Sequence, residues 1–386
     1  MILALQTDTF GTYGGIPTYN RLVCRVLNEL GPCLKASVLI AMDERGFVQG
    51  DAPLHQNLCL KGFGGNRVRF VMAAMRSVIR DRTTLILAGH VNYAPLCLLL
   101  KILRPQLRFG VVIYGWDAWF RILRIRRWAL KQADFIISIS DYTKQQAIAI
   151  NGLDEQRIFV LPNALEWKDS KAGQDAAPSS LPPGTRLLSV GRLDSCEQQK
   201  GFDTVISALP SIAARVSDVQ YVIIGSGTDL ERHRQLAQKL GVSDRVHFLG
   251  SVDEPVLRRC YELCDIFVMP SAQEGFGFVY LEAMQYAKAV VAARSGGVRE
   301  AVEDQVTGRL VSYGDEKELA EALIELSLDP EKRARLGSAG YRRLQEKFTY
   351  PQFKQTLTEI LAANLPLGIT AEKEIPVGQS TPHFPQ

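Results

Sequence analysis

The chain has 386 residues, of which 46% are hydrophobic and 22% are charged, with a net charge of +4 at neutral pH. This composition is typical of a soluble globular protein, the length suits two α/β domains rather than one, and the small net charge gives no reason to expect a nucleic-acid partner. Seven cysteines without any Cys-x-x-Cys spacing predict neither a zinc site nor a disulfide framework and favour a reducing, cytosolic compartment.

The first half of the chain alternates short apolar strands with longer helical patterns. It begins directly as a strand, without a basic segment or a cleavage site, so no signal peptide is expected. The long apolar stretch 85–103 contains a histidine, a proline and a lysine, and therefore predicts a strand followed by a helix rather than a membrane span. Strands are predicted at Ile2–Leu5, Ser37–Ile40, Leu85–Ala88, Phe109–Tyr114, Phe135–Ser138 and Ile158–Leu161.

Basic residues are concentrated in the same half. Residues 1–165 hold 20 Lys and Arg against 11 Asp and Glu, a balance of +9, whereas the remainder holds 25 against 30, a balance of −5. Arginines gather in the stretches NRVRFVMAAMRSVIRDR and FRILRIRRWALK. Basic amphipathic helices of this kind bind anionic lipid headgroups or a phosphate-bearing substrate, although a solvated helix surface explains the pattern equally well.

A segment rich in Pro, Ser, Ala and Gly separates two domains. We predict an N-terminal domain at 1–165, a linker at 166–185 and a second domain at 186–345. A closing helix is predicted at 346–364, and residues 365–386 are expected to be disordered. The second set of strands is predicted at Arg186–Val190, Gln220–Ile224, Arg245–Leu249, Ile266–Met269, Ala289–Ala292 and Arg309–Val311. The alternation predicts an α/β protein with two parallel sheets flanked by helices.

Three glycine turns follow strands of the second half, where an open parallel sheet binds its ligands. SVGRLDSCEQQKGFD places Arg192 and Lys200 beside glycines, and two such cations suit a diphosphate. VIIGSG places Gly225 at a strand end, where a simple tight turn is about as good an explanation as ligand contact. QEGFGFVYLEAM places Glu274 and Glu282 around a glycine bend, at a spacing that returns to nearly the same face of a helix. The N-terminus of that helix would attract an anion.

Together these motifs resemble the GT-B fold glycosyltransferases of family 4, which carry the "glycosyl transferases group 1" domain. The resemblance rests on SVGRL…KGFD, VIIGSG, RVHFLGSV, DIFVMPSAQEGFGFVYLEAM, AVVAARSGGVREAVED and TGRLV, and more loosely on GTYGGIPTYNRLV and VVIYGWDAW. It implies two Rossmann-like domains facing each other across a cleft, with a C-terminal helix that returns to the N-terminal domain.

The resemblance also implies a function. The enzyme would be a retaining transferase that moves a hexose from a nucleotide-diphosphate sugar, of the GDP-mannose or UDP-glucose type, to a hydroxyl of a glycan or lipid-linked acceptor. Surface polysaccharide or glycolipid synthesis would be its setting. It would be cytoplasmic, with possible attachment to an anionic membrane at the inner face through the basic N-terminal domain.

The resemblance assigns roles to the second-half residues. Glu282 would accept hydrogen bonds from the ribose hydroxyls, and Glu274 would contact hydroxyls of the donor sugar. Arg192 and Lys200 would neutralise the two phosphates as the glycosidic bond breaks. Structural roles compete with these: a solvent-facing helix acid for Glu282, a helix cap for Glu274 and a surface lysine for Lys200. Other donor contacts would come from main-chain atoms at Gly225, Gly250, Val252, Gly275, Phe276, Gly277 and Phe278.

In the first half, the resemblance places the glycine pair Gly14 and Gly15 against the donor phosphates and the acceptor, with a structural turn as the competing explanation. The stretch YGWDAW departs from the family, because many relatives carry a histidine where this chain has Tyr114. Three residues compete for the role of that histidine, which contacts the transferred sugar. They are Tyr114 through its hydroxyl, Asp117, and His90 from the neighbouring strand end, which a core histidine explains equally well.

No Asp-x-Asp pair occurs, so the metal-binding carboxylates of the other large glycosyltransferase fold are missing. We therefore predict metal-independent transfer with no cofactor, and the lack of an obvious general-base dyad fits a front-face reaction. The alternatives are an NDP-sugar epimerase or a phosphorylase on the same fold, and a catalytically impaired nucleotide-sugar-binding subunit. A dinucleotide-dependent oxidoreductase would need a full Gly-x-Gly-x-x-Gly, which GTYGGIP does not supply.

Overall fold

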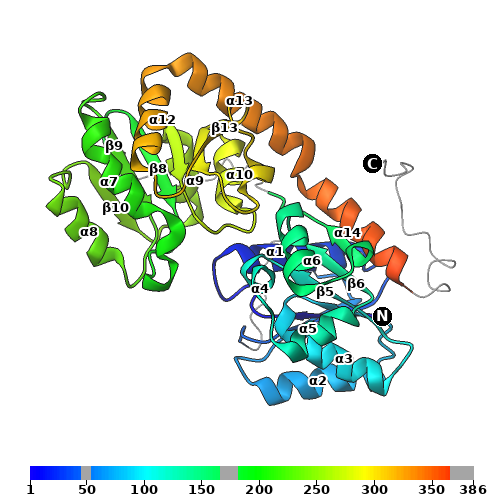
Figure 1. The fold of residues 1–386 in the computed structure, drawn as a ribbon. Coiled ribbons are helices and arrows are strands. Elements are labelled where there is room, and N and C mark those ends of the chain that lie inside the picture. Colours follow the sequence, from blue (N-terminus) through cyan, green and yellow to red (C-terminus); the bar gives the residue numbers. More distant parts are fainter. Residues whose placement is uncertain (45–53, 166–180, 366–386) are drawn as a thin grey trace. The chain divides into compact units, whose positions relative to one another are not determined.

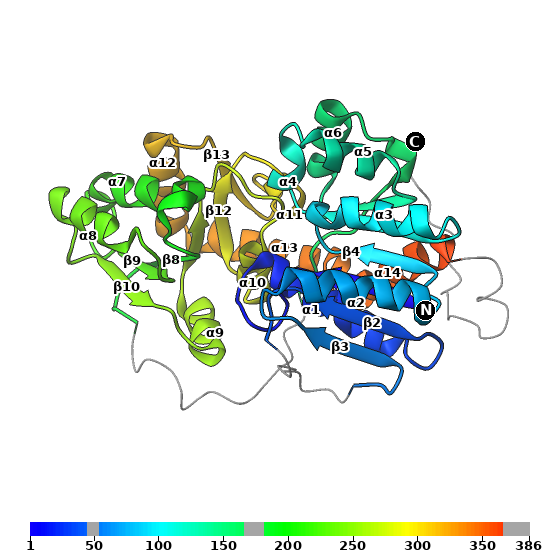
Figure 2. The same ribbon diagram turned by 90° about the horizontal axis from the view of Figure 1, so that it is seen from below.

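The computed structural model describes residues 1–44, 54–165 and 181–365. The chain divides into two compact units, one formed by Met1–Ala164 with the segment from Tyr350 onward, the other by Leu165–Thr349. Each unit is a parallel sheet with helices packed on it (Figures 1 and 2). The predicted α/β class with two Rossmann-like units is therefore confirmed. Most of the predicted linker, and all but the first residue of the predicted disordered tail, lie outside the described residues.

The first unit contains a seven-stranded parallel sheet in the order β3-β2-β1-β4-β5-β6-β7. Its strands are β1 (Ile2–Gln6), β2 (Ala36–Ile40), β3 (Leu58–Gly62), β4 (Leu85–Ala88), β5 (Arg108–Ile113), β6 (Phe135–Ser138) and β7 (Ile158–Val160). Its helices are α1 (Gly15–Glu29), α2 (Arg67–Arg80), α3 (Ala94–Leu103), α4 (Trp116–Trp119), α5 (Arg124–Lys131), α6 (Asp141–Asn151) and α14 (Tyr350–Asn364), with short 3₁₀ turns η1 (Val91–Tyr93) and η2 (Glu155–Arg157). The strand order reverses between β1 and β4, which is where such sheets bind ligands.

The last helix, α14, packs against α1 of the first unit. Phe353 meets Tyr19 edge to face, with ring centroids 5.2 Å apart, and the guanidinium of Arg25 lies 3.9 Å from the ring centre of Tyr350. Lys354 adds an ion pair with Glu29 at 2.6 Å. The C-terminal helix therefore belongs to the first unit, as predicted.

The second unit contains a six-stranded parallel sheet in the order β10-β9-β8-β11-β12-β13. Its strands are β8 (Arg186–Val190), β9 (Gln220–Ile224), β10 (Val246–Gly250), β11 (Ile266–Met269), β12 (Ala289–Ala293) and β13 (Gly308–Val311). Its helices are α7 (Phe202–Ala213), α8 (Leu230–Lys239), α9 (Glu254–Leu263), α10 (Phe278–Gln285), α11 (Val298–Ala301), α12 (Glu316–Leu328) and α13 (Pro330–Lys347), with a 3₁₀ helix η3 (Ser195–Lys200). Here the order reverses between β8 and β11.

Of the thirteen strands in the described residues, twelve begin and end within one residue of their predicted bounds, because buried parallel strands are continuous apolar runs. The strand that the sequence did not reveal is β3, which pairs only with β2 at the edge of the first sheet. Its sequence LCLKG contains Lys61, and its burial alternates with exposure. In the part of the chain that the structure describes, no helix is long and apolar enough to cross a bilayer. The stretch 85–103 forms β4 and α3, as predicted.

Candidate functional site

The loops that follow β8, β9, β10 and β11 are tied to one another at the carboxyl edge of the second sheet. The N–H of Gly225 donates to the carbonyl of Gly250 at 2.8 Å, which joins the loops after β9 and β10. The N–H of Ala272 donates to the carbonyl of Gln199 at 2.8 Å, which joins the loop after β11 to η3. The backbone around the reversal of strand order is therefore held in place without a ligand.

Gly225 has a structural reason to be glycine. Its φ is +138°, and a Cβ atom there would lie 1.8 Å from the carbonyl oxygen of Gly191. Any other residue here would push the loop after β9 away from Gly191, in the loop after β8. The tight-turn explanation is therefore sufficient for Gly225, and its predicted contact with a donor stays a prediction.

Lys200 and Glu274 meet at this edge. The Nζ atom of Lys200 lies 3.0 Å from Oε2 of Glu274, and the two side chains are only 22% and 19% exposed. The negative charge of Glu274 raises the pKa of Lys200 above its ordinary value, against the opposing effect of burial. Lys200 is therefore a charged ammonium at neutral pH, held at the end of η3 and next to the loop after β11.

Arg192 lies apart from this pair. Its guanidinium forms an ion pair with Glu197, and its side chain remains 65% exposed. The segment between Arg192 and Lys200 contains the 3₁₀ helix η3, and Glu197 lies on it. The positive charge of Arg192 acts to lower the pKa of Lys200, against the larger effect of Glu274. Glu197 itself carried no motif that would have revealed it.

Glu274 and Glu282 lie on either side of the glycine bend, as predicted, but they do not share a helix face. The helix α10 begins only at Phe278, and Glu274 lies in the preceding loop, where its carbonyl accepts the N–H of Gly297 at 3.0 Å. Gly277 precedes the helix with a φ of +93°, a conformation that favours glycine. Different elements therefore position the two acids: the loop before the glycine bend holds Glu274, and the helix after it holds Glu282.

Glu282 lies on α10 and is partly buried. The hydroxyl of Tyr261, on α9, donates a hydrogen bond of 2.7 Å to its Oε2 atom. Burial raises the pKa of Glu282 to about 7, although the hydrogen bond from Tyr261 acts in the opposite direction. A freely solvated helix acid does not fit these surroundings. Tyr261 stands 21 residues earlier in the sequence, so the motif alone could not have identified it.

The remaining predicted donor contacts are distributed along the same edge. Phe276 is fully buried and packs edge to face on Phe348, with centroids 5.2 Å apart, and Phe278 is nearly buried. Their side chains belong to the core, so only their main-chain atoms, with those of Gly275 and Gly277, are available to a ligand. Gly250 ends β10 with a φ of +70°, and the partly exposed Val252 follows it.

In the first unit, the loop between β1 and α1 is held by a buried carboxylate. Asp43 accepts hydrogen bonds from the N–H groups of Thr9, Phe10 and Gly11 at 3.2, 2.8 and 3.3 Å. The loop then reaches Gly14, whose φ is +149°, and α1 starts at Gly15. Asp43 stands beside Glu44 after the end of β2, and no motif singled it out in the sequence.

The turn after β5 is built around Asp117. One carboxylate oxygen, Oδ1, accepts the N–H groups of Tyr114 at 2.9 Å and Gly115 at 2.8 Å. The other, Oδ2, is buried and has no hydrogen-bond partner among the described residues. Burial raises the pKa of Asp117, while the nearby His90 acts in the opposite direction. A buried carboxylate oxygen without a partner is costly, so it points to a missing hydrogen-bond donor.

His90 and Tyr114 stack beside that turn, with ring centroids 6.5 Å apart. The Nδ1 atom of His90 accepts the N–H of Asn92 at 3.1 Å, which leaves the proton of a neutral ring on Nε2. Burial lowers the pKa of His90, and the negative charge of Asp117 raises it again. The hydroxyl of Tyr114 donates to Asn20 at 3.4 Å, and burial raises its pKa well above its ordinary value. The structure therefore brings together the three candidates for the role of the family histidine.

Over residues 1–44, 54–165 and 181–365, no group of three or more His, Cys, Asp or Glu side chains is arranged to hold a metal ion. Arg192, after β8, and Lys200, at the end of η3, are the predicted cations at the carboxyl edge of the second sheet.

Comparison with known families gives two matches that together span most of the chain. Residues 13–166 match the model described as "Glycosyltransferase Family 4", and residues 178–343 match "Glycosyl transferases group 1". The chain is 30% identical over 282 residues to a Mycobacterium tuberculosis protein, the GDP-mannose-dependent alpha-(1-6)-phosphatidylinositol monomannoside mannosyltransferase. That match covers 68% of this chain and 73% of the relative. It is 29% identical over 287 residues to the alpha-maltose-1-phosphate synthase of Mycolicibacterium smegmatis, covering 68% and 70% of the two chains.

Solved structures have the same fold. The Anabaena protein HepE in complex with UDP superposes with a TM-score of 0.72 at 21% identity, covering 94% of this chain and 99% of that one. The sucrose-phosphate synthase of Thermosynechococcus elongatus superposes with a TM-score of 0.75 at 19% identity, covering 94% and 98%. At these identities the likeness extends to the fold alone.

Proposed function

This chain belongs to the family 4 glycosyltransferases of the GT-B type, and we propose that it moves a hexose from a nucleotide-diphosphate sugar to a hydroxyl of a glycan or lipid-linked acceptor. The observation that carries the proposal is the contact of Lys200 with Glu274 at the reversal of strand order in the second sheet. A cation for a phosphate and an acid for sugar hydroxyls are thereby joined at a ligand-binding edge.

The second unit would hold the donor. Lys200 would bind the diphosphate, with Arg192 as the second cation once it leaves Glu197, and main-chain N–H groups at the start of α10 would add donors. Glu282, held by Tyr261, would accept hydrogen bonds from the ribose hydroxyls. The carboxylate of Glu274 would turn from Lys200 toward the hydroxyls of the sugar.

The same groups explain how the glycosidic bond would break. Negative charge develops on the leaving phosphate, and the ammonium of Lys200 stabilises it there, which is usually the largest catalytic contribution. In a front-face reaction the leaving phosphate takes the proton of the acceptor hydroxyl, and the new bond forms on the face that the phosphate leaves. The anomeric configuration is then retained, and no side chain has to serve as base.

The first unit would hold the acceptor and part of the sugar. The unpartnered Oδ2 of Asp117 would accept a hydrogen bond from a hydroxyl of the acceptor or of the sugar. The Nε2–H of His90 would donate a hydrogen bond to a second hydroxyl of these molecules. The loop between β1 and α1, at Gly14 and Gly15, would bring main-chain atoms to the donor phosphates and the acceptor. This assignment gives the buried oxygen of Asp117 the partner it lacks.

The function is tested by screening donors with the purified protein. GDP-mannose, UDP-glucose and ADP-glucose are added in turn, and melting temperature and sugar release are measured with EDTA in excess. GDP-mannose is the first choice because relatives that share 30% identity are named for it. We expect one donor to stabilise the protein by about 2.7 kcal/mol at 100 times its Kd, and to be hydrolysed or transferred without added metal.

Two outcomes of this screen would contradict the proposal. Stabilisation without any release of sugar would indicate a binding subunit rather than an enzyme. Complete loss of turnover in EDTA, restored by Mn²⁺, would show that the reaction depends on a metal. Proton NMR of the first product formed then reports whether the anomeric configuration is retained.

We also propose that the first unit attaches to an anionic membrane through α2, α3 and α5. These helices pack side by side on the sheet (Figure 1). Between residues 64 and 131 the chain has thirteen Lys and Arg but only two acids, Asp81 and Asp117. The large apolar side chains that this layer exposes are Val68, Met72, Ile79, Leu99, Ile102, Leu103, Leu123, Ile125 and Trp128. Exposed apolar groups among arginines suit the interface of an anionic bilayer.

The double variant Ile125→Ser, Trp128→Ser is expected to bind vesicles containing phosphatidylglycerol at least about tenfold more weakly, because two large apolar groups no longer enter the bilayer. Vesicle flotation measures the effect. The matched variant Tyr313→Ser, Leu328→Ser removes two exposed apolar side chains from the second unit and should float like the unaltered protein. Equal binding by all three proteins would rule out this surface.

A further inference from the structure

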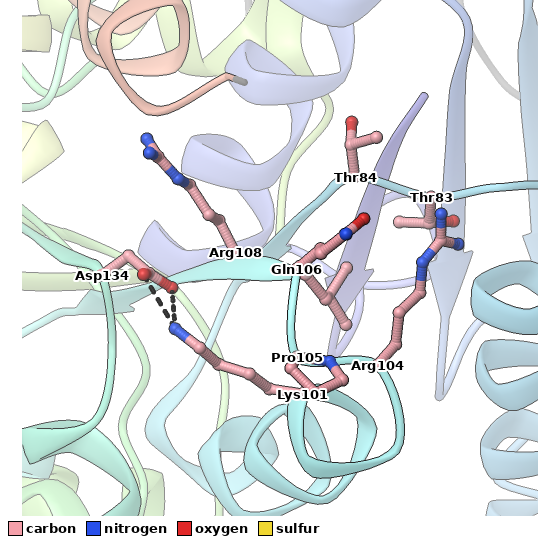
Figure 3. A pocket seen from close by; sticks show the side chains of 9 residues that line it. Thr83, Thr84, Lys101, Arg104, Pro105, Gln106, Arg108 and Asp134 are labelled. Carbon is pink, nitrogen blue, oxygen red and sulfur yellow. Dashed lines mark hydrogen bonds and ion pairs between the residues drawn. The ribbon is translucent and has the colours of Figure 1, made fainter. Parts of the chain in front are cut away.

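The first unit contains a cavity of about 470 Å³ where β4 and β5 begin, but its charged side chains do not converge on one point (Figure 3). Both oxygens of Asp134 are paired with the ammonium of Lys101, at 2.8 and 2.7 Å. Arg104 and Arg108 extend away from each other and donate to main-chain carbonyls of α2 and α14. We therefore assign no ligand to this cavity.

In the second unit, Asp203, Asp229, Arg232 and His233 form a charge cluster where the neighbouring helices α7 and α8 begin (Figure 1). The Nε atom of Arg232 donates to both carboxylate oxygens of Asp229 at 2.8 Å, and a terminal nitrogen of the same guanidinium donates to Oδ2 of Asp203 at 2.8 Å. The Nε2 atom of His233 lies 3.1 Å from Oδ1 of Asp203, and its Nδ1 atom lies 2.7 Å from the carbonyl oxygen of Asp229. Asp229 and His233 are almost completely buried. The cluster thereby links Asp203, in the first turn of α7, to the first turn of α8.

The chain between Lys200 and Asp203 has little conformational freedom. Gly201 has a φ of +84°, and a Cβ atom there would lie 2.4 Å from a carbonyl oxygen of the loop after β11. The side chain of Phe202 is buried, and its ring meets that of His233 edge to face, with centroids 5.7 Å apart. Because each residue of this short connection is held, the contacts of Asp203 help to fix the position of Lys200.

The residues at the start of α8 also hold the loop after β8, which contains Arg192. The N–H of Asp229 donates to the carbonyl of Leu193 at 2.7 Å. The carboxylate of Asp194 accepts the N–H of Thr228 at 3.2 Å. The segment 192–200, which contains both predicted phosphate-binding cations, is therefore attached near each of its ends to residues 228–233.

We propose that Asp203 and His233 are positioning residues, which hold the segment 192–200 so that Arg192 and Lys200 can bind one diphosphate. This inference rests on the proposed function, in which these two cations bind the donor. The competing explanation is that the charge cluster only joins α7 to α8. However, six buried apolar side chains already anchor α7 along its length, and charged groups removed from water add little net stability, because the loss of hydration offsets their attraction. The directional contacts of the cluster instead fix the relative positions of the segments that carry them.

The test measures the affinities of full-length proteins for GDP and for UDP by isothermal titration. Although burial acts to raise the pKa of Asp203, His233 and Arg232 lower it below its ordinary value, so Asp203→Asn removes a negative charge and keeps the shape of the side chain. We expect this variant to bind the preferred nucleotide about fivefold more weakly or worse, because Lys200 is no longer held at the diphosphate. In a Lys200→Ala background the same change should cost less than about twofold, because the group through which Asp203 acts is gone. His233→Asn, whose amide can reach the carbonyl of Asp229 but not Asp203, should show the same two effects and provides a second test if Asp203→Asn folds poorly.

The control is Asp265→Asn, which removes a partly buried ion pair with Arg186, 3.1 Å long, from the opposite edge of the same sheet. It should lower the melting temperature but leave the affinity for the nucleotide unchanged, which separates positioning from stability. Unchanged affinity in the folded Asp203 and His233 variants, an equal loss with and without Lys200, or an equal loss in Asp265→Asn would overturn the inference. If Lys200→Ala weakens binding and Asp203→Asn does not, the inference alone fails. If Lys200→Ala itself binds GDP and UDP as the unaltered protein does, the assignment of Lys200 in the proposed function fails as well.

Discussion

Replacing Glu282 with glutamine is expected to weaken the binding of the donor about 10- to 100-fold, because a hydrogen bond to a charged group contributes about 1.5–3 kcal/mol. The side chain keeps its shape, and its amide oxygen can still accept the hydroxyl of Tyr261. At a donor concentration of 100 times the original Kd, a 100-fold loss would reduce the stabilisation from about 2.7 to about 0.4 kcal/mol. Thermal melting with and without donor measures this change.

The same variant should change how stability depends on pH. The pKa of Glu282 is raised to about 7, above the value of about 4.3 that a glutamate has in an unfolded chain. Between these two values the folded protein binds more protons than the unfolded chain, so the free energy of unfolding falls as the pH rises through this window. Without donor, Glu282→Gln should therefore melt at a higher temperature than the unaltered protein above pH 7, and this advantage should vanish near pH 4.

The affinity for the donor should change with pH in the direction opposite to the free energy of unfolding. The ribose hydroxyls need an ionised acceptor, so the affinity of the unaltered protein should rise as the pH increases toward and past 7, and that of the variant should lack this dependence. Glu321→Gln, at an exposed position on α12, is the matched control and should alter neither property. Donor stabilisation that is undiminished in Glu282→Gln would contradict the ribose role, whatever the melting temperature of the free protein.

The fold could be predicted because its determinants are local. Buried parallel strands are apolar runs bounded by glycine turns, and this pattern located twelve of the strands that the structure describes, whereas their order in each sheet comes from the structure. It failed at β3, where burial on one side only left an alternating sequence with Lys61. The return of α14 to the first unit was expected from the family resemblance, while the contacts that secure it, such as Tyr19 with Phe353, join residues more than 300 positions apart.

The candidate site was predictable only where its residues share a motif. Lys200 and Glu274 were each marked by an adjacent glycine turn, and the parallel sheet brings their loops together. The residues that form hydrogen bonds or ion pairs with other predicted site residues carry no motif of their own. Tyr261 donates a hydrogen bond to Glu282 across 21 residues, and Glu197, on η3, forms an ion pair with Arg192. Such partners depend on tertiary packing, which a linear motif does not record.

Without a donor, the ammonium of Lys200 already forms an ion pair with the carboxylate of Glu274. Replacing Glu274 is therefore expected to have opposite effects on the binding of the nucleotide diphosphate and on turnover. A nucleotide diphosphate must compete with that carboxylate for the ammonium. Glu274→Gln removes the competitor, so the free nucleotide diphosphate is expected to bind about two- to fivefold more tightly, corresponding to the 0.5–1 kcal/mol of a partly exposed ion pair. Turnover of the sugar donor should nevertheless fall about 10²- to 10³-fold, as for the loss of one group that stabilises the transition state.

Lys200→Ala should show the complementary pattern, because the nucleotide diphosphate then loses its principal cation. Its binding should weaken, and turnover should fall by a similar factor of about 10² to 10³. Lys239→Ala, which removes an exposed lysine at the end of α8, should leave both properties unchanged. Isothermal titration with the nucleotide diphosphate and initial rates with the donor separate the two measurements. If Glu274→Gln weakens the nucleotide diphosphate as much as Lys200→Ala does, the two side chains act only as a structural ion pair, and the assignment of Lys200 to the diphosphate and Glu274 to the sugar is wrong.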